Sequence, residues 1–217
     1  RIHGHLDFWA QGGRLGFKMA SLDPKYTIGD IAQSRDEVVR RLVAEGLMDT
    51  NKRRPMSPVP LRVGVVTSVG TAAWHDFHDE LARSGFGFRL VVADVRVQGD
   101  LAENMVTAGI ARLAMLGTLD VIVVIRGGGA RNELAVFDSE KIARMIANSP
   151  VPVLTGLGHE VDRSVADDVA HLALKTPTAV AGELLGRVAA YTTNAEQTFA
   201  AILQRSTAVL TDASTEL

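Results

Sequence analysis

The 217-residue chain contains no cysteine, which excludes disulfides and thiolate metal sites and is typical of proteins in a reducing cytosol. It also lacks any run of about 20 apolar residues and any secretory signal pattern, so we expect a cytoplasmic protein that does not bind membranes. The formal net charge of −2 provides no overall field that attracts nucleic acid. Any binding of nucleic acid must therefore depend on local basic groups.

The composition that remains, 47% hydrophobic and 22% charged, is ordinary for a globular chain that buries one substantial core. The chain begins at Arg1 inside an alternating segment, without an initiator methionine, and it ends within an apparently helical stretch. We therefore expect the sequence to be a fragment of a longer protein.

The N-terminal part has two kinds of pattern before residue 61. Residues 2–21 alternate around a turn at 11–14, which predicts a β-hairpin and makes 1–34 a separate unit. Residues 35–45 have helical spacing, and Gly46 stands where a C-terminal cap belongs. Residues 51–60 contain three prolines and a basic cluster, so we interpret 35–60 as a helix followed by a linker.

From Leu61 the pattern changes to alternating strands and helices. Strands are predicted at 62–67, 89–95, 120–125 and 151–157, and helices at 71–84, 100–116 and 138–147. Such a series predicts an α/β domain over 61–177, with a doubly wound, mainly parallel sheet and right-handed crossovers. Apolar residues at helical intervals in 178–217 predict the start of a long helical arm.

The third of these strands, 120–125, is a run of β-branched residues that leads directly into Arg126-Gly127-Gly128-Gly129. Consecutive glycines allow the backbone to approach a ligand closely, and an arginine beside them adds a positive charge with forked donors. The junction therefore predicts an anion site for phosphate, although a tight turn alone would use the same glycines. Its spacing matches neither the dinucleotide fingerprint nor the Walker loop.

Three unusual segments each follow a strand directly: 67–70, 126–129 and 156–162. Because ligands of open α/β sheets bind outside the carboxyl ends of the strands, we expect these segments to share one edge. His159 has an imidazole suited to proton transfer at neutral pH, and Asp162 could orient it. Together with an arginine–glycine phosphate clamp, these groups suit phosphodiester hydrolysis. We expect Ser68, Gly127, Gly128, Gly129 and Gly158 to contact the phosphate.

Each candidate residue also has an ordinary structural interpretation. His159 could be a packed or capping histidine, Asp162 could cap a helix that begins near Arg163, and Asp76 could lie on a solvated helix face. His75 and Asp79 are four residues apart on one helix face, and His78 is adjacent. No third ligand is evident, so we predict no metal site.

Several strings resemble the large subunit of exodeoxyribonuclease VII, in register over 45–183. They are 45–49, 64–68 with 72–73 and 75–76, 97–99, 126–129, 136–138, 149–153, 158–162 and 176–178. The resemblance implies degradation of single-stranded DNA from either end to short oligonucleotides. It also implies catalytic residues at Asp76, Arg126, His159 and Asp162, with no strict need for a divalent metal, although Mg²⁺ could stimulate activity.

The same resemblance implies that 1–34 is the end of an OB-fold and that 178–217 is the start of an arm that binds a small helical subunit. The chain departs from the family at Thr71, where glycine is usual, and at Ala130, where serine is usual. We interpret the four catalytic residues as intact and expect little activity from this fragment alone. The alternative is a module that binds a nucleotide or phosphate on the glycines without chemistry.

Overall fold

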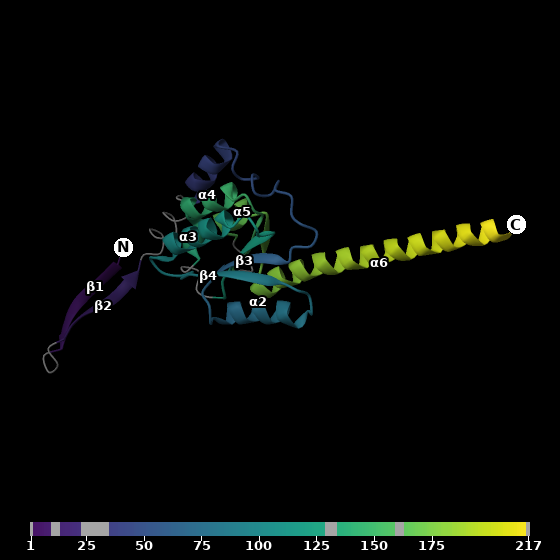
Figure 1. Cartoon of the computed structure of the whole chain (residues 1–217). Coiled ribbons are helices and arrows are strands. Elements are labelled where there is room, and N and C mark those ends of the chain that lie inside the picture. The colour runs from purple at the N-terminus through teal and green to yellow at the C-terminus, as the bar shows by residue number, and fades with distance from the viewer. Residues whose placement is uncertain (1, 10–13, 23–34, 129–133, 159–162, 216–217) are drawn as a thin grey trace.

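The computed structural model of the chain describes the backbone of residues 2–9, 14–22, 35–128, 134–158 and 163–215, and the side chains of 35–128, 134–158 and 163–208. The described residues form two sheets, as shown in Figure 1. Strands β1 (Ile2–Trp9) and β2 (Arg14–Leu22) pair as an antiparallel hairpin. The predicted hairpin is therefore confirmed, while its origin in an OB-fold remains a prediction.

The second sheet has five parallel strands in the order β4-β3-β5-β6-β7. They are β3 (Arg62–Thr67), β4 (Arg89–Asp94), β5 (Val121–Ile125), β6 (Val153–Gly156) and β7 (Leu172–Leu174). Every residue of β5 is buried, because the run of β-branched side chains is covered on both faces of the sheet. The four predicted strands are confirmed, and β7 adds a fifth.

Helices cover both faces of this sheet, which confirms the doubly wound prediction. One face packs against α2 (Ala72–Arg83) and the beginning of α6 (Pro177–Thr215). The other packs against α3 (Ala102–Met115), α4 (Glu140–Asn148) and α5 (Val165–Val169), with a 3₁₀ turn at Ala135–Asp138 before α4. Side chains along β5 alternate between the two cores, so both faces of the sheet are apolar.

Residues 35–44 are helical, and Gly46 follows them with a φ of 71°, as the predicted cap requires. Val38 and Leu42 of this helix are buried in the same core as α3 and α4. Asn51 is completely buried; its amide nitrogen donates to the carbonyl of Val151 (3.2 Å) and its oxygen accepts from the N–H of Val153 (2.8 Å). The segment interpreted as a linker is therefore held against β6.

Helix α6 belongs partly to the domain and partly to the projecting arm in Figure 1. Its first turns are buried at Val180, Ala181 and Leu184, and a Cβ atom on Gly156 of β6 would lie only 2.6 Å from Val180. From 189 to 208 every side chain is exposed. None of the described helices is both long and apolar enough to span a membrane.

Candidate active site

A cleft of about 430 Å³ lies at the carboxyl edge of the sheet, where the strand order reverses between β3 and β5. A reversal of this kind leaves a crevice, because the loops after the two strands lead to opposite sides. The cleft is lined by Ser68, Thr71, Ala72, Ala73, Arg96, Val97, Gln98, Gly127 and Gly128, which follow β3, β4 and β5. Two of the three predicted segments therefore meet in one cleft.

The β3 side of the cleft is the start of α2. Thr71 is the N-cap: its hydroxyl oxygen accepts from the N–H of Trp74 (3.4 Å), and the hydroxyl donates to the carbonyl of Ser68 (2.7 Å). The N–H of Val69 donates to a carboxylate oxygen of Asp94 (3.0 Å), which ties this loop to β4. Because the first N–H groups of a helix lack partners within the helix, this wall carries partial positive charge.

The β5 side is the arginine–glycine junction. Gly127 and Gly128 line the cleft as predicted, and a Cβ atom on Gly127 would lie 3.5 Å from that of Ala73 in α2. The side chain of Arg126, which was predicted to place a positive charge beside the glycines, is completely buried. Its backbone N–H continues the sheet by donating to the carbonyl of Gly156 (3.1 Å). Gly129 lies outside the described residues.

The loop after β6 contacts this junction through Gly158. A Cβ atom there would lie 3.3 Å from the carbonyl of Gly127 and from the nitrogen of Gly128. Gly158 has a φ of 80°, and its N–H donates to the carbonyl of Lys175 (3.0 Å). The two segments predicted to converge therefore touch at this point. His159 and Asp162 lie outside the described residues, so the geometry of the predicted base and its partner is not described.

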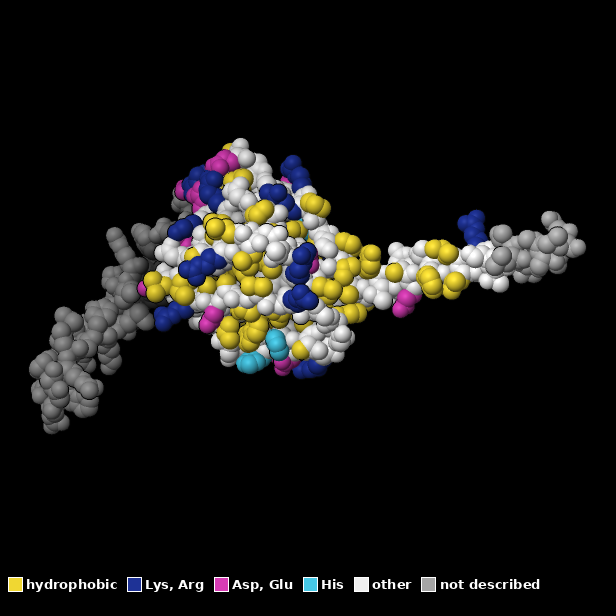
Figure 2. Space-filling model, in the orientation of Figure 1, with side chains coloured by type: hydrophobic (Ala, Val, Ile, Leu, Met, Phe, Trp, Pro, Cys, Tyr) yellow, Lys and Arg dark blue, Asp and Glu magenta, His cyan; other side chains and the backbone are white. Residues whose placement is uncertain are grey.

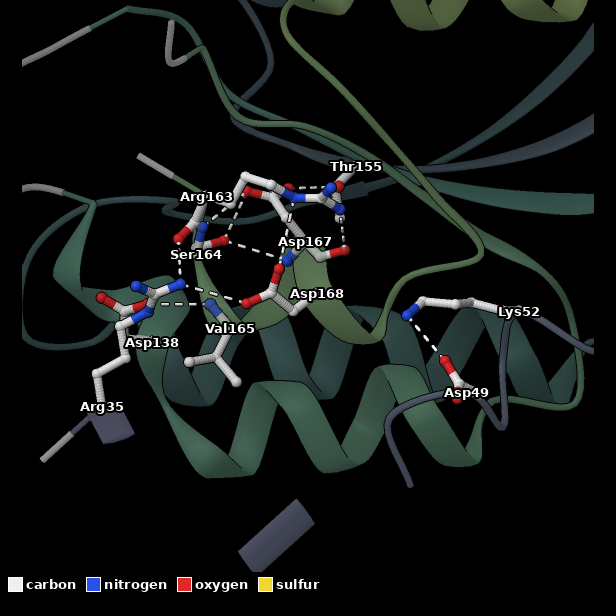
Figure 3. A network of polar contacts seen from close by, with 10 residues as sticks. All are labelled: Arg35, Asp49, Lys52, Asp138, Thr155, Arg163, Ser164, Val165, Asp167 and Asp168. Atoms are coloured by element: carbon white, nitrogen blue, oxygen red, sulfur yellow. Dashed lines mark hydrogen bonds and ion pairs between the residues drawn. The ribbon is translucent and has the colours of Figure 1, made fainter. Parts of the chain in front are cut away.

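Beyond these residues the chain re-enters the core through a buried polar network, drawn in Figure 3. Ser164 caps α5: its hydroxyl accepts from the N–H of Asp167 (3.2 Å) and donates to the Asp167 carboxylate (2.8 Å). The hydroxyl of Thr155 in β6 donates to the other carboxylate oxygen of Asp167 (2.5 Å). Ser164 is therefore the N-cap of α5, whereas Asp162, for which a capping role was considered, lies outside the described residues.

Ion pairs surround this network. Arg35 lies 3.6 Å from the Asp138 carboxylate and 3.2 Å from that of Asp168, and Arg163 lies 3.4 Å from Asp168. Asp138 also accepts from the N–H of Val165 (3.0 Å). Burial raises the pKa of Asp138 despite that hydrogen bond. The start of α5 is thus tied to the helix at 35–44.

Asp76 lies on α2, about one turn beyond Ala73, and is exposed. It is not one of the side chains that line the cleft. Nearby, Nδ1 of His78 lies 3.1 Å from a carboxylate oxygen of Asp79. Within 35–128, 134–158 and 163–208, no three histidine or acidic side chains gather as metal ligands would.

Comparison with known proteins gives a consistent result. The protein-family model described as "Exonuclease VII, large subunit" matches residues 47–217. The exodeoxyribonuclease 7 large subunit of Synechococcus sp. (strain CC9605) is 39% identical over 187 residues, which are 85% of this chain and 48% of that protein. The protein of the same name from Nostoc sp. (strain PCC 7120 / SAG 25.82 / UTEX 2576) is 34% identical over 203 residues, or 94% and 49%. The chain spans about half the length of these curated relatives.

Proposed function

This chain belongs to the family of exonuclease VII large subunits, and we propose that its α/β domain is the catalytic core of an exonuclease. The proposed substrate is single-stranded DNA, degraded from either end to short oligonucleotides. The contact of Gly158 with Gly127 and Gly128 is the observation that most directly supports a catalytic role for this domain. His159 is the next residue in the chain, so the contact favours a proton-transfer group beside a phosphate-binding loop.

The proposed reaction is attack of water on a DNA phosphorus, with cleavage of the bond to one ester oxygen. The backbone amides of Gly127 and Gly128 hold the phosphate, and His159 moves a proton as general acid or general base. Asp162 positions the imidazole or the water, and the resemblance to the family assigns the same task to Asp76, although the described residues that line the cleft do not include it. Arg126 stabilises the growing negative charge from its buried position, where a low dielectric strengthens the interaction.

The charge of the cleft supports phosphate as the group that binds there. The described residues that line it include no acidic side chain. They do include Ala72 and Ala73, at the N-terminus of α2. N–H groups at the start of a helix attract anions because their dipoles point outward. A phosphodiester is the anion that the family relationship makes relevant.

We further propose that the exposed part of α6 binds the small subunit. Tyr191, Phe199 and Ile202 are 52%, 63% and 57% exposed, and their spacing places them near one stripe of the helix. Figure 2 shows apolar side chains along the described part of the arm. An exposed apolar stripe of this kind is expected to be covered by a partner.

The decisive experiment is digestion of single-stranded DNA by the full-length protein in complex with the small subunit. The His159→Ala variant should lose activity by at least about a hundredfold, since general acid–base catalysis contributes that much or more. His78→Ala, an exposed histidine outside the cleft, is the control and should digest normally.

Three results would contradict parts of this proposal. Undiminished digestion by His159→Ala would remove that residue from the mechanism. A complex that binds a mononucleotide tightly in calorimetry but never digests DNA would favour a binding module instead. Strong digestion by residues 1–217 alone would show that the rest of the protein and the small subunit are not needed.

A further inference from the structure

We propose that Arg96 binds a second phosphate of the DNA strand, outside the bond that is cut, and so directs the strand across the cleft toward β4. This inference depends on the proposed function, because it takes single-stranded DNA as the ligand. It concerns the residues after β4 that line the cleft, none of which has a role in the proposed reaction.

The position of Arg96 is fixed by its neighbours while its side chain stays accessible. Val95 and Val97 on either side are buried, with 8% and 7% of their surface exposed, whereas Arg96 is exposed and lines the cleft. The N–H of Val95 donates to the carbonyl of Thr67 (2.9 Å), which holds this backbone against β3. The guanidinium therefore extends from a rigid base.

Arg96 is the only charged side chain among the described residues that line the cleft. In the described part of the chain its guanidinium makes no ion pair and no hydrogen bond, whereas Arg35, Arg62 and Arg144 each pair with a carboxylate. The family-matched Arg126 is buried, so among the described residues Arg96 is the guanidinium that the cleft presents to a ligand. Its planar fork suits two oxygens of a phosphate.

Among the described residues that line the cleft, no acidic side chain balances the positive charge; the Asp94 carboxylate, outside this lining, accepts from the N–H of Val69 (3.0 Å). Arg96 shares the cleft with the N-terminus of α2, whose partial charge has the same sign, and the polar residues between them, Ser68 and Thr71, are neutral. Like charges that line a common cavity repel each other unless an anion lies between them. A polyanionic strand supplies phosphates to both walls at once, which a single phosphate on the glycine loop does not.

The test uses the full-length protein with its small subunit and compares Arg96→Gln with Arg89→Gln. Arg89 is also exposed but lies at the amino end of β4, whereas Arg96 follows the carboxyl end, and Arg89 is not among the residues that line the cleft. Arg96→Gln should raise KM and Kd for a single-stranded oligonucleotide by about tenfold, with kcat nearly unchanged. It should also reduce the slope of log Kd against log salt concentration by about 0.7, as expected for one lost phosphate contact on a single strand.

Arg96→Lys should keep the salt slope, because the charge remains, and recover part of the affinity. Oligonucleotides with one neutral methylphosphonate then identify the contacted phosphate. When the neutral group replaces the phosphate that Arg96 contacts, the wild-type complex should lose about tenfold in affinity. The Arg96→Gln complex should lose nothing further at that position, because the neutral phosphonate and the substitution remove the same interaction.

The inference is overturned if Arg96→Gln and Arg89→Gln have the same KM and salt slope while the wild-type complex digests DNA. If the wild-type complex does not digest DNA, the proposed function fails. The oligonucleotide Kd values and salt slopes then still decide whether Arg96 contacts a phosphate.

Discussion

The loops after β5 and β6 are packed against each other, whereas the loop after β4 is open to solvent on the same edge of the sheet. On the packed side, Arg126 is completely buried and Gly158 touches the backbone of Gly127. On the open side, Arg96 is exposed and Gly99, which has a φ of 82°, has no atom within 4 Å of where a Cβ would lie.

This difference suggests how the two sides divide the work of binding DNA. Burying the Arg126 cation and the Asp167 network is costly unless each polar group has a partner. We therefore expect the packed side to have one fixed arrangement of its side chains. On the open side the exposed side chain of Arg96 extends from a backbone fixed by buried Val95 and Val97, so the side chain itself can adapt to a flexible strand. Substitutions should therefore affect the chemistry on the packed side and affinity or local stability on the open side.

The largest effect is expected for Gly158→Ala. A left-handed φ costs a non-glycine residue roughly 1–3 kcal/mol, and the new methyl group would also push against Gly127. Displacing the residue before His159 should reduce kcat/KM by about a hundredfold while the domain still folds. Digestion kinetics and thermal unfolding of the full-length complex would measure both quantities.

Gly99→Ala is the matched comparison on the open side, because it has the same backbone penalty without a steric neighbour. It should lower the free energy of unfolding by a similar amount and change kcat much less. Equal losses of kcat in the two variants would mean that backbone strain, and not the contact between the two loops, explains the effect.

The second largest effect is expected for the stability of the buried polar network around Asp167. Thr155→Val keeps the shape of the side chain but removes the hydroxyl that donates to Asp167. Loss of a hydrogen bond to a buried carboxylate should lower the free energy of unfolding by about 2 kcal/mol. Chemical denaturation of the purified protein would measure it.

The control for this variant is Thr107→Val in α3. The Thr107 hydroxyl is also largely buried, but it donates to the neutral carbonyl of Glu103. The expected loss is only about 0.5 kcal/mol, because a hydrogen bond to a neutral acceptor is weaker. If both valine variants lose the same stability, the Asp167 network adds nothing beyond an ordinary hydrogen bond.

The smallest effect is expected at Thr71, which follows β3 and lines the same cleft. Thr71→Ala removes the cap of α2 and should lower the free energy of unfolding by about 1 kcal/mol, measured by thermal unfolding. Thr71→Gly should lose only a few tenths of a kcal/mol, because glycine is a better N-cap than alanine. A glycine variant less stable than the alanine variant would show that the Thr71 hydroxyl is not acting as a cap.

Most of the sheet could be predicted from the sequence, because long β-branched runs such as 120–125 are strands in almost any context. Strand β7 could not be, since Leu172–Leu174 has only three half-buried residues and depends on pairing with β6. The convergence of the glycine loop with Gly158 followed from the rule that parallel strands end at one edge.

The side-chain arrangement of the site was less predictable. Asp162 and Ser164 are both suitable caps for α5, and only the reciprocal bond with Asp167 selects Ser164. The spacing of Ser164 and Asp167 resembles a capping box and could have indicated this choice. Arg126 and Arg96 have the same chemistry, so only the packing of the sheet decides which one is buried.

The close approach of Gly156 to α6 has a mechanical consequence. With Val180 seated directly on β6, the strand has no room for a side chain between itself and the helix. The helix continues without interruption to Thr215. Its contact with the sheet lies at Gly156, two residues before Gly158. Because Val180 packs directly against Gly156, we expect a shift of the helix to displace β6 next to the loop that contains Gly158.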